Sequence, residues 1–299
     1  MDEELHDHDR GLGFDLSTLI ARRRLLTLFA GAGLAVVAAG CGSSNKSSAT
    51  TTAGSQATSA TDATAATAAT AATDATAATA STQATAATAA NLEAIPEETA
   101  GPYPGDGSNG PDVLSESGIV RSDIRSSFGA STTTAAGVPA AISLTLVDAN
   151  GGAPLPGAAV YLWHCDAEGR YSLYSQGVTK ENYLRGVQEA DSNGVVTFTS
   201  IFPACYSGRW PHIHYEVYPT LADATTASNL LATSQLALTE EASTAVYASD
   251  LYPQSTQNLS RVSLSSDNVF SDGADLETPT ITGSVAGGFA ITMTAAVNA

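Results

Sequence analysis

The sequence is poor in positive charge. Only 12 of its 299 residues are Lys or Arg, against 30 Asp and Glu, and the formal net charge is −18. A protein that follows a nucleic-acid backbone needs clustered cations to displace counterions from the phosphates. This composition therefore excludes a nucleic-acid-binding protein, and we expect no nucleic-acid partner.

Charged residues of either sign are also scarce, at 14% of the chain, whereas hydrophobic residues make up 43%. Much of that hydrophobic fraction is alanine in a repetitive Ala/Thr stretch between about residues 48 and 90. Such a stretch buries too little apolar surface to offset the conformational entropy lost on ordering. We therefore expect residues 41–91 to form a disordered tether and residues 92–299 to form one folded domain.

Long hydrophobic runs are absent apart from one at residues 25–40, and its 16 residues fall short of a membrane span. Three arginines, Arg22 to Arg24, stand directly before this run, and small residues end it, which is the layout of an export signal. The arginines are similar to those of a twin-arginine signal. We therefore predict that residues 1–40 direct the domain out of the cytoplasm.

The run ends in Ala38-Ala39-Gly40-Cys41, which resembles a bacterial lipobox. In this interpretation Cys41 carries a lipid and becomes the first residue of a mature cell-envelope lipoprotein, and the lipid is its contact with the membrane. A secreted protein and an uncleaved single membrane anchor are the alternatives. In all three cases the folded domain lies outside the cytoplasm.

Cysteine is rare as well, and the chain has three, at positions 41, 165 and 205. If Cys41 is lipidated, Cys165 and Cys205 are an even pair in an oxidising compartment, where a disulfide is reasonable. Two buried free thiols are the alternative.

From residue 140 onward, short strands and turns take the place of any long helical periodicity. Ala141–Asp148 alternates apolar and polar residues and is followed by a turn signal. Further predicted strands are Ala159–Trp163, Arg170–Tyr174, Val195–Ile201, His212–Tyr218, Thr233–Leu238, Arg261–Ser265 and Gly288–Ala295. Leu221–Leu231 and Glu240–Tyr247 are at most short helices. This pattern predicts an all-β fold, a β-sandwich with few short helices, which residues 92–140 wrap as an N-terminal arm.

Only three histidines follow the signal, namely His164, His212 and His214. Residues i and i+2 of a strand point to the same face, so His212 and His214 present two imidazoles side by side. Such a pair can ligate a metal, and two polar residues on the solvated face of an edge strand are the alternative. We expect His164, beside Trp163, to be a structural strand residue rather than a further ligand.

Two tyrosines accompany this pair. Tyr206 precedes His212 by six residues, with Arg209 between them, and Tyr171 stands in an earlier segment. Tyrosine has a pKa near 10, so it ionises at neutral pH only beside a strong Lewis acid. Fe(III) is the natural candidate, because zinc usually takes Cys or carboxylate ligands and Fe(II) oxygenases use two His and one carboxylate.

Three segments around these residues resemble the intradiol ring-cleavage dioxygenases, most closely the exported single-chain members similar to protocatechuate 3,4-dioxygenase. These segments are Trp163–Tyr171, Tyr183–Gly186 and Ile201–His214. The arm adds Glu98–Tyr103 and Val120–Arg125. The resemblance covers about residues 95–240 and is specific, because four ligands follow one another at suitable spacings.

The resemblance implies a non-haem Fe(III) whose ligands are Tyr171, Tyr206, His212 and His214. Tyr206 and His214 match the axial positions, and the other two match the equatorial ones. Arg209 matches the arginine that stabilises negative charge on the substrate, and Gln235 matches a glutamine that lines the same pocket.

The implied reaction is cleavage of a catechol-type ring between its two hydroxylated carbons, with O2 as co-substrate and a muconate-type dicarboxylate as product. The substrate would chelate the iron through both hydroxyls and displace Tyr206, which would accept a proton. Arg209 would stabilise the developing negative charge. The helical dimerisation segment of the catechol-type enzymes is absent, which leaves the oligomeric state open. The identity of the catechol is open as well.

The two later cysteines gain a role in this interpretation. Cys165 precedes Tyr171 by six residues, and Cys205 directly precedes Tyr206. If both tyrosines meet at one metal, the two cysteines are brought together. We therefore expect a Cys165–Cys205 disulfide that braces the iron site, and a loop of about 40 residues would contribute ~3–4 kcal/mol on the chain-entropy model.

Two other functions remain open at this stage. A tethered, non-catalytic β-sandwich that binds carbohydrate or acts as an adhesin fits the tether and the acidic composition equally well. A catalytically degenerate relative would bind iron without turnover. The ordered set of four ligands favours the enzyme.

Overall fold

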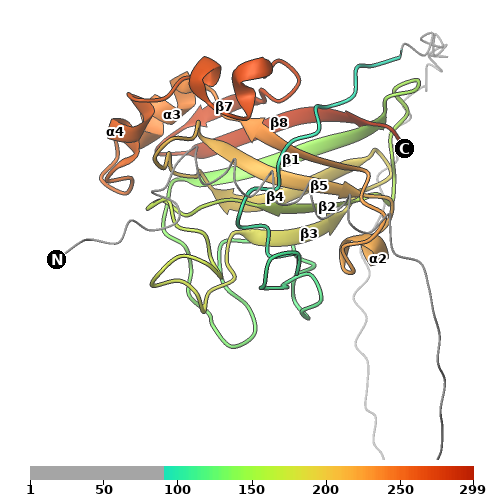
Figure 1. The fold of residues 1–299 in the computed structure, drawn as a ribbon, viewed down its shortest axis with the longest axis horizontal. Helices are drawn as coiled ribbons and strands as arrows, with labels where there is room; N and C mark the ends of the chain where they lie inside the picture. Colours follow the sequence, from blue (N-terminus) through green and yellow to red (C-terminus); the bar gives the residue numbers. More distant parts are fainter. Residues whose placement is uncertain (1–90) are drawn as a thin grey trace, which may run out of the picture. The chain divides into compact units, whose positions relative to one another are not determined.

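A computed structural model describes residues 91–299 of the chain (Figure 1). The predicted export signal at residues 1–40, the lipidation of Cys41 and all but the last residue of the tether lie outside these residues. None of the helices in the described part is long and apolar enough to cross a membrane.

The described residues contain eight strands and several short helices. In chain order they are β1 (Pro139–Asp148), β2 (Ala159–Trp163), β3 (Arg185–Glu189), β4 (Val195–Ile201), β5 (His212–Tyr218), α2 (Leu221–Ala224), β6 (Ala232–Ala237), α3 (Glu240–Tyr247), α4 (Ser255–Leu259), the 3-10 helices η2 (Leu264–Ser266) and η3 (Phe270–Asp272), β7 (Thr280–Ser284) and β8 (Gly288–Val297). The strands form two sheets, in the orders β4-β1-β8-β7 and β3-β2-β5-β6. Among these strands, β1 and β8 pair in parallel, and the other pairs are antiparallel. The predicted all-β fold with few short helices is confirmed.

The alternation of β1 explains how the first sheet covers the core. Ile142, Leu144 and Leu146 are buried, whereas Ser143 and Thr145 between them are partly exposed. Strands β2, β5 and β6 are buried along their whole length, so both faces of the second sheet are covered. Figure 1 shows α3 and α4 at one end of the sheets and α2 at the other.

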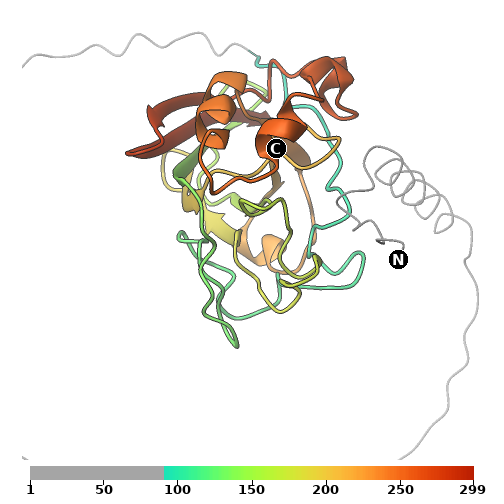
Figure 2. The same cartoon turned by 90° about the vertical axis from the view of Figure 1, so that its left-hand side faces the viewer.

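The N-terminal arm pairs with three strand edges, as predicted. The backbone N–H of Glu98 donates to β6 at 2.7 Å, that of Arg121 donates to β3 at 3.0 Å, and that of Ile124 donates to β4 at 3.0 Å. β3 and β6 are the two edges of the second sheet, and β4 is an edge of the first. The arm thereby covers edges that would otherwise expose unpaired backbone groups. Figure 2 shows the arm (teal) on one side and the β7–β8 hairpin (red) on the other.

A buried arginine fastens the arm to the second sheet. Arg185 of β3 is 1% exposed. Its guanidinium donates to the carbonyl oxygens of Tyr103 and Pro104 in the arm, each at 2.9 Å, and to the Tyr161 hydroxyl at 3.0 Å. It also donates to Ser172 Oγ at 3.0 Å. The part of the arm around Tyr103 and Pro104 is therefore fixed to the second sheet.

Two predicted strands are wrong. Arg170–Tyr174 is a turn, because the Ser175 N–H donates to the Tyr171 carbonyl at 2.9 Å and Leu173 has a φ of 75°. Arg261–Ser265 begins after α4 has ended and runs into the first two residues of η2. Strands β3 and β7 were not predicted. β7 is mostly exposed, so it carries no apolar alternation.

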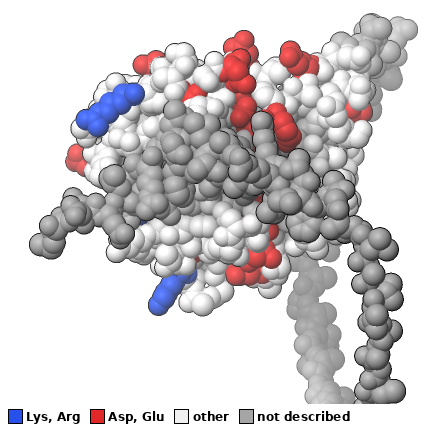
Figure 3. All heavy atoms as spheres, viewed as in Figure 1, with Lys and Arg blue, Asp and Glu red and all other residues white. Residues whose placement is uncertain are grey.

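The surface reflects the acidic composition. Acidic side chains predominate over basic ones on the described surface that faces the viewer in Figure 3. This face of the folded domain therefore carries mainly negative charge.

Candidate metal centre

The four predicted ligands meet at the start of β5. His212 and His214 lie on the same face of this strand, and Tyr171 and Tyr206 reach them from two loops. The Nε2 atom of His212 lies 3.3 Å from Tyr171 Oη, 3.2 Å from Tyr206 Oη and 3.2 Å from His214 Nε2. All four side chains are buried. The structure therefore brings the whole predicted set together.

The nitrogen donors are prepared to bind a metal. Burial lowers the pKa of His212 and of His214 well below the usual value, so both imidazoles are neutral. The Nδ1 atom of His212 lies 2.6 Å from the carbonyl oxygen of Trp210. A carbonyl only accepts hydrogen bonds, so Nδ1 carries the hydrogen and Nε2 keeps its lone pair. That lone pair faces the other three donor atoms.

The oxygen donors restrict the choice of metal. Burial raises the pKa of Tyr171 well above its usual value, so only a strong Lewis acid would ionise it. Within residues 91–299, no group of three or more His, Cys, Asp or Glu side chains is arranged to hold a metal ion. Two phenols and two neutral imidazoles are a donor set that fits Fe(III).

Neighbouring strands hold His214 in place. In the antiparallel pairing it lies opposite Trp163 of β2 and Gln235 of β6. The Trp163 ring stacks on the His214 imidazole, with centroids 4.9 Å apart and planes 4° apart. No local signal in the sequence marks Trp163 for this contact, because the stacking joins two strands.

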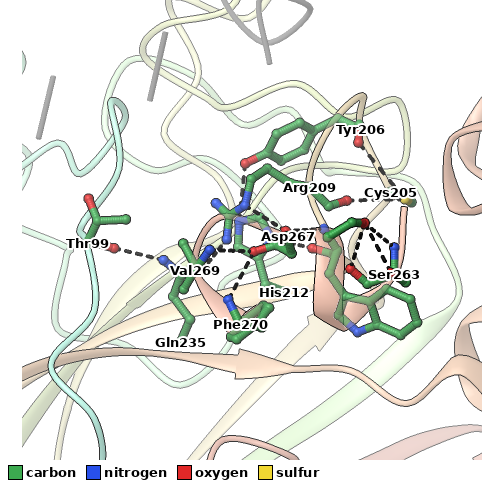
Figure 4. Close-up of polar contacts among 12 residues, drawn as sticks. Thr99, Cys205, Tyr206, Arg209, His212, Gln235, Ser263, Asp267, Val269 and Phe270 are labelled. Atoms are coloured by element: carbon green, nitrogen blue, oxygen red, sulfur yellow. Dashed lines mark hydrogen bonds and ion pairs between the residues drawn. The ribbon is translucent and has the colours of Figure 1, made fainter. Parts of the chain in front are cut away.

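Arg209 and Gln235 lie together beside the four ligands, as the resemblance implied. Arg209 is 1% exposed, and its Nη2 donates to Gln235 Oε1 at 2.8 Å. Gln235 Nε2 in turn donates to the carbonyl oxygen of Thr99 at 2.8 Å (Figure 4). After burial, the positive charge of Arg209 is the next cause of the low pKa of His212, which places this cation close to the donor set.

One acid in this network was not predicted. Asp267 is fully buried and accepts hydrogen bonds from Arg209 Nε at 3.0 Å and from the backbone N–H of Trp210 at 2.6 Å (Figure 4). It stands 58 residues after Arg209 in the sequence. The surrounding segment is rich in serine, and nothing in its local pattern distinguishes this carboxylate.

The arm closes over the ligands. Gly101 has a φ of +67°, and a Cβ atom at this position would lie 3.3 Å from Cε1 of His214. The Tyr103 ring packs on Tyr171 with centroids 4.9 Å apart, and on Tyr174 with centroids 5.3 Å apart. Only a residue without a side chain fits at position 101 without strain.

His164 is structural, as expected. Its Nε2 lies 2.7 Å from Ser200 Oγ and its Nδ1 lies 2.8 Å from the carbonyl oxygen of Cys165. Both ring nitrogens are thus engaged by the protein, and burial lowers the pKa of this histidine to about 4. Trp210 is a packing residue whose indole donates to the Leu238 carbonyl at 2.7 Å.

The predicted disulfide is wrong. Cys165 and Cys205 are both free and buried. The Sγ of Cys165 lies 3.6 Å from the carbonyl oxygen of Ala204, and that of Cys205 lies 3.5 Å from the carbonyl oxygen of Arg209. Burial raises the pKa of Cys205 to about 12, so its thiol is neutral. Convergence of two tyrosines does not set the Cβ directions that a disulfide requires.

Two carboxyl groups near the site have raised pKa values. Burial, together with the charge of Asp272, raises the pKa of Glu98 to about 7. Burial, together with the charge of Glu98, raises the pKa of Glu277 to about 8. The arm and the segment before β7 thus bring two weakly ionised acids close to each other.

Comparison with known proteins agrees with the site. A dioxygenase family model matches residues 109–220, which include all four candidate ligands and Arg209. The solved intradiol ring-cleavage dioxygenase from Tetranychus urticae is 27% identical, with a TM-score of 0.55 over 69% of this chain and 95% of that one. In sequence and fold, the chain is therefore similar to the intradiol ring-cleavage dioxygenases.

A curated member of the family, catechol 1,2-dioxygenase from Pseudomonas sp. (strain EST1001), is 40% identical over 55 residues. This segment spans 18% of the present chain and 18% of that enzyme. Gln235, Asp267 and the arm residues Thr99–Tyr103 lie outside the region that the family model matches. Their place at the site rests on the geometry alone.

Proposed function

We propose that this chain is a non-haem Fe(III) dioxygenase. It cleaves a catechol-type ring between its two hydroxylated carbons with O2 and yields a muconate-type dicarboxylate. The observation that carries the proposal is the approach of two phenol oxygens and one imidazole nitrogen to within 3.2–3.3 Å of His212 Nε2. Similarity to the intradiol dioxygenases supports the reaction class.

Tyr171, Tyr206, His212 and His214 would hold the iron, which supplies a Lewis acid that favours ionised catechol hydroxyls and activates the ring toward O2. Tyr206 is the tyrosine suited to move, because it is 9% exposed whereas Tyr171 is fully buried. As a tyrosinate, Tyr206 accepts a proton from a substrate hydroxyl at Oη. Tyr171 stays in place and keeps its position among the other donors.

Arg209 provides the positive charge that catechol cleavage requires of the protein. Its guanidinium is held in a buried site, where charge interactions are stronger than in water. A fixed cation stabilises negative charge that develops on the substrate without reorganising first. Gln235 holds this cation through its Oε1 and is itself held by Thr99.

Purified full-length protein tests the proposal. We expect equimolar iron, a wine-red colour from tyrosinate-to-Fe(III) charge transfer, and oxygen uptake with at least one of catechol, protocatechuate and hydroxyquinol. A colourless protein that binds no iron would refute the proposal and favour a non-catalytic binding module. A red protein without oxygen uptake on a wide catechol panel would identify a degenerate relative.

The proposal also places the enzyme outside the cytoplasm, because residues 1–40 resemble an export signal that ends at Cys41. Cys41→Ser is expected to move the protein from the membrane fraction to the soluble fraction. An unchanged distribution in cell fractionation would contradict the lipid anchor.

A further inference from the structure

Asp267 is a fully buried carboxylate that accepts four hydrogen bonds. Its Oδ2 accepts from Arg209 Nε at 3.0 Å and from the backbone N–H of Trp210 at 2.6 Å. Its Oδ1 accepts from the backbone N–H groups of Val269 at 2.8 Å and Phe270 at 3.2 Å. Figure 4 shows the Asp267 carboxylate between Arg209 and the residues Val269 and Phe270 that follow Asp267 in the chain.

The turn itself holds this residue. The backbone N–H of Asp267 donates to the Ser263 carbonyl at 3.0 Å, and the Asp267 carbonyl accepts from the Ser271 N–H at 3.1 Å. Together with the two bonds to Oδ1, these local contacts orient the carboxylate from within residues 263–271. The local segment therefore presents Oδ2 in one direction, toward Arg209 and Trp210.

The same oxygen is connected to two parts of the metal centre. Arg209 is bound at Nε by Asp267 and at Nη2 by Gln235, and two bonds at different nitrogens fix the plane of the guanidinium. Trp210 is bound at its N–H by Asp267, and its carbonyl oxygen accepts from Nδ1 of His212 at 2.6 Å. One carboxylate thus orients both the arginine and a predicted iron ligand.

We infer that Asp267 is the positioning residue of this site. It holds the Arg209 guanidinium toward the substrate and, through Trp210, helps to keep Nε2 of His212 directed at the metal. This inference rests on the proposed function. Without the carboxylate, the Arg209 Nε–H would be a buried charged donor without its anion, and such a group reorients or admits water.

The variant Asp267→Asn tests this role while keeping the size of the side chain. Its amide keeps one acceptor oxygen and turns the other into an NH2 group that faces donors. Either the bonds to Arg209 and Trp210 or those to Val269 and Phe270 are then lost, and Arg209 loses its anion in both cases. We expect kcat to fall about 10- to 100-fold, since a misdirected cation loses transition-state stabilisation. We expect KM to change less than about threefold, and the iron content and tyrosinate absorption band to persist. Asp275→Asn, an exposed acid of the same segment, is the matched control and should keep wild-type kcat.

A double-mutant comparison separates positioning from general stabilisation. If Asp267 acts mainly through Arg209, adding Asp267→Asn to Arg209→Ala should lower kcat by no more than about twofold. A loss as large as in the wild-type background would overturn the inference, and so would a folded Asp267→Asn with wild-type kcat.

A third measurement does not depend on activity or on a folded variant. In metal-free wild-type protein, the Nε–H of Arg209 should exchange with solvent far more slowly than that of exposed Arg261, as measured by NMR. Equal exchange would overturn the inference. A protein that holds no iron and takes up no oxygen would refute the proposed function, while this measurement would still test whether the Arg209 Nε–H stays protected in a hydrogen bond.

Discussion

At the residue scale, a second group orients each of the two histidines at the candidate metal centre. The Trp163 ring stacks on His214, and the Trp210 carbonyl fixes the hydrogen of His212. Tyr206 differs from the other three predicted ligands in exposure, because its side chain is partly accessible to solvent. The most exposed of the predicted ligands is therefore the tyrosine that the proposed reaction requires to leave.

Replacement of that tyrosine separates iron binding from catalysis. Tyr206→Phe removes one phenolate while three donors remain, so the protein should fold and keep iron. We expect a changed but persistent visible spectrum and kcat about 100-fold lower, because the proton acceptor is gone. Oxygen-uptake kinetics and absorption spectra check this.

Tyr215→Phe provides the matched control, since Tyr215 is buried on the opposite face of β5 from His212 and His214. It should keep the wild-type spectrum and rate. A Tyr206→Phe protein with both properties unchanged would show that Tyr206 is not a ligand.

At the scale of elements, the arm is part of the site as well as a cover for strand edges. The Arg185 guanidinium donates hydrogen bonds to the carbonyl oxygens of Tyr103 and Pro104, and Gly101 lies against His214. The backbone of Thr99 also holds Gln235. A change in the arm should therefore reach the candidate metal centre even though no arm residue is a predicted ligand.

Two glycines with similar backbone angles test this coupling. Gly101 has a φ of +67° and Gly129 a φ of +74°, but a Cβ at Gly129 would meet nothing within 4 Å. Both alanine variants should lose about 1 kcal/mol of stability from backbone strain. Only Gly101→Ala should also shift the visible spectrum and lower kcat, because its methyl group presses on His214. Equal spectra and rates for the two variants would argue against a catalytic role of the arm.

At the scale of the whole molecule, buried titratable groups make stability depend on pH. The pKa of Glu277 is raised from 4.5 to about 8, so the folded protein retains a proton that the unfolded chain has lost. Stability contributed by this group is therefore lost as pH rises toward and through 8. Buried His164, whose pKa is lowered to about 4, acts in the opposite direction below pH 6.5.

Thermal unfolding of the metal-free protein between pH 6.5 and 8.5 isolates the carboxyl effect. We expect the wild type to lose stability over this range, and Glu277→Gln to reduce that loss by roughly 1–2 kcal/mol. Glu189→Gln, which replaces an exposed acid at the end of β3, should leave the pH dependence unchanged. The same slope in wild type and Glu277→Gln would mean that Glu277 is ionised in the folded state.

The sequence predicts those features that depend on local pattern. Alternation placed β1, β4 and β5 correctly, and the resemblance identified four side chains that lie together. Position next to a ligand predicted a disulfide that Cys165 and Cys205 do not form. Asp267 and Trp163 reach the site from distant parts of the chain, and such contacts depend on the folded arrangement rather than on neighbouring residues.

The pairing of β1 with β8 has a consequence for biosynthesis. Ala140 lies beside Phe289 and Asp148 beside Val297, so a strand near the start of the domain pairs in parallel with the last one, which also separates it from β7. A nascent chain therefore keeps one edge of β1 unpaired until β8 has been synthesised. Such distant pairing slows folding and leaves an edge open to other chains. The domain is expected to complete its fold only after β8 has left the ribosome, and a truncation before Gly288 would remove an inner strand of the first sheet.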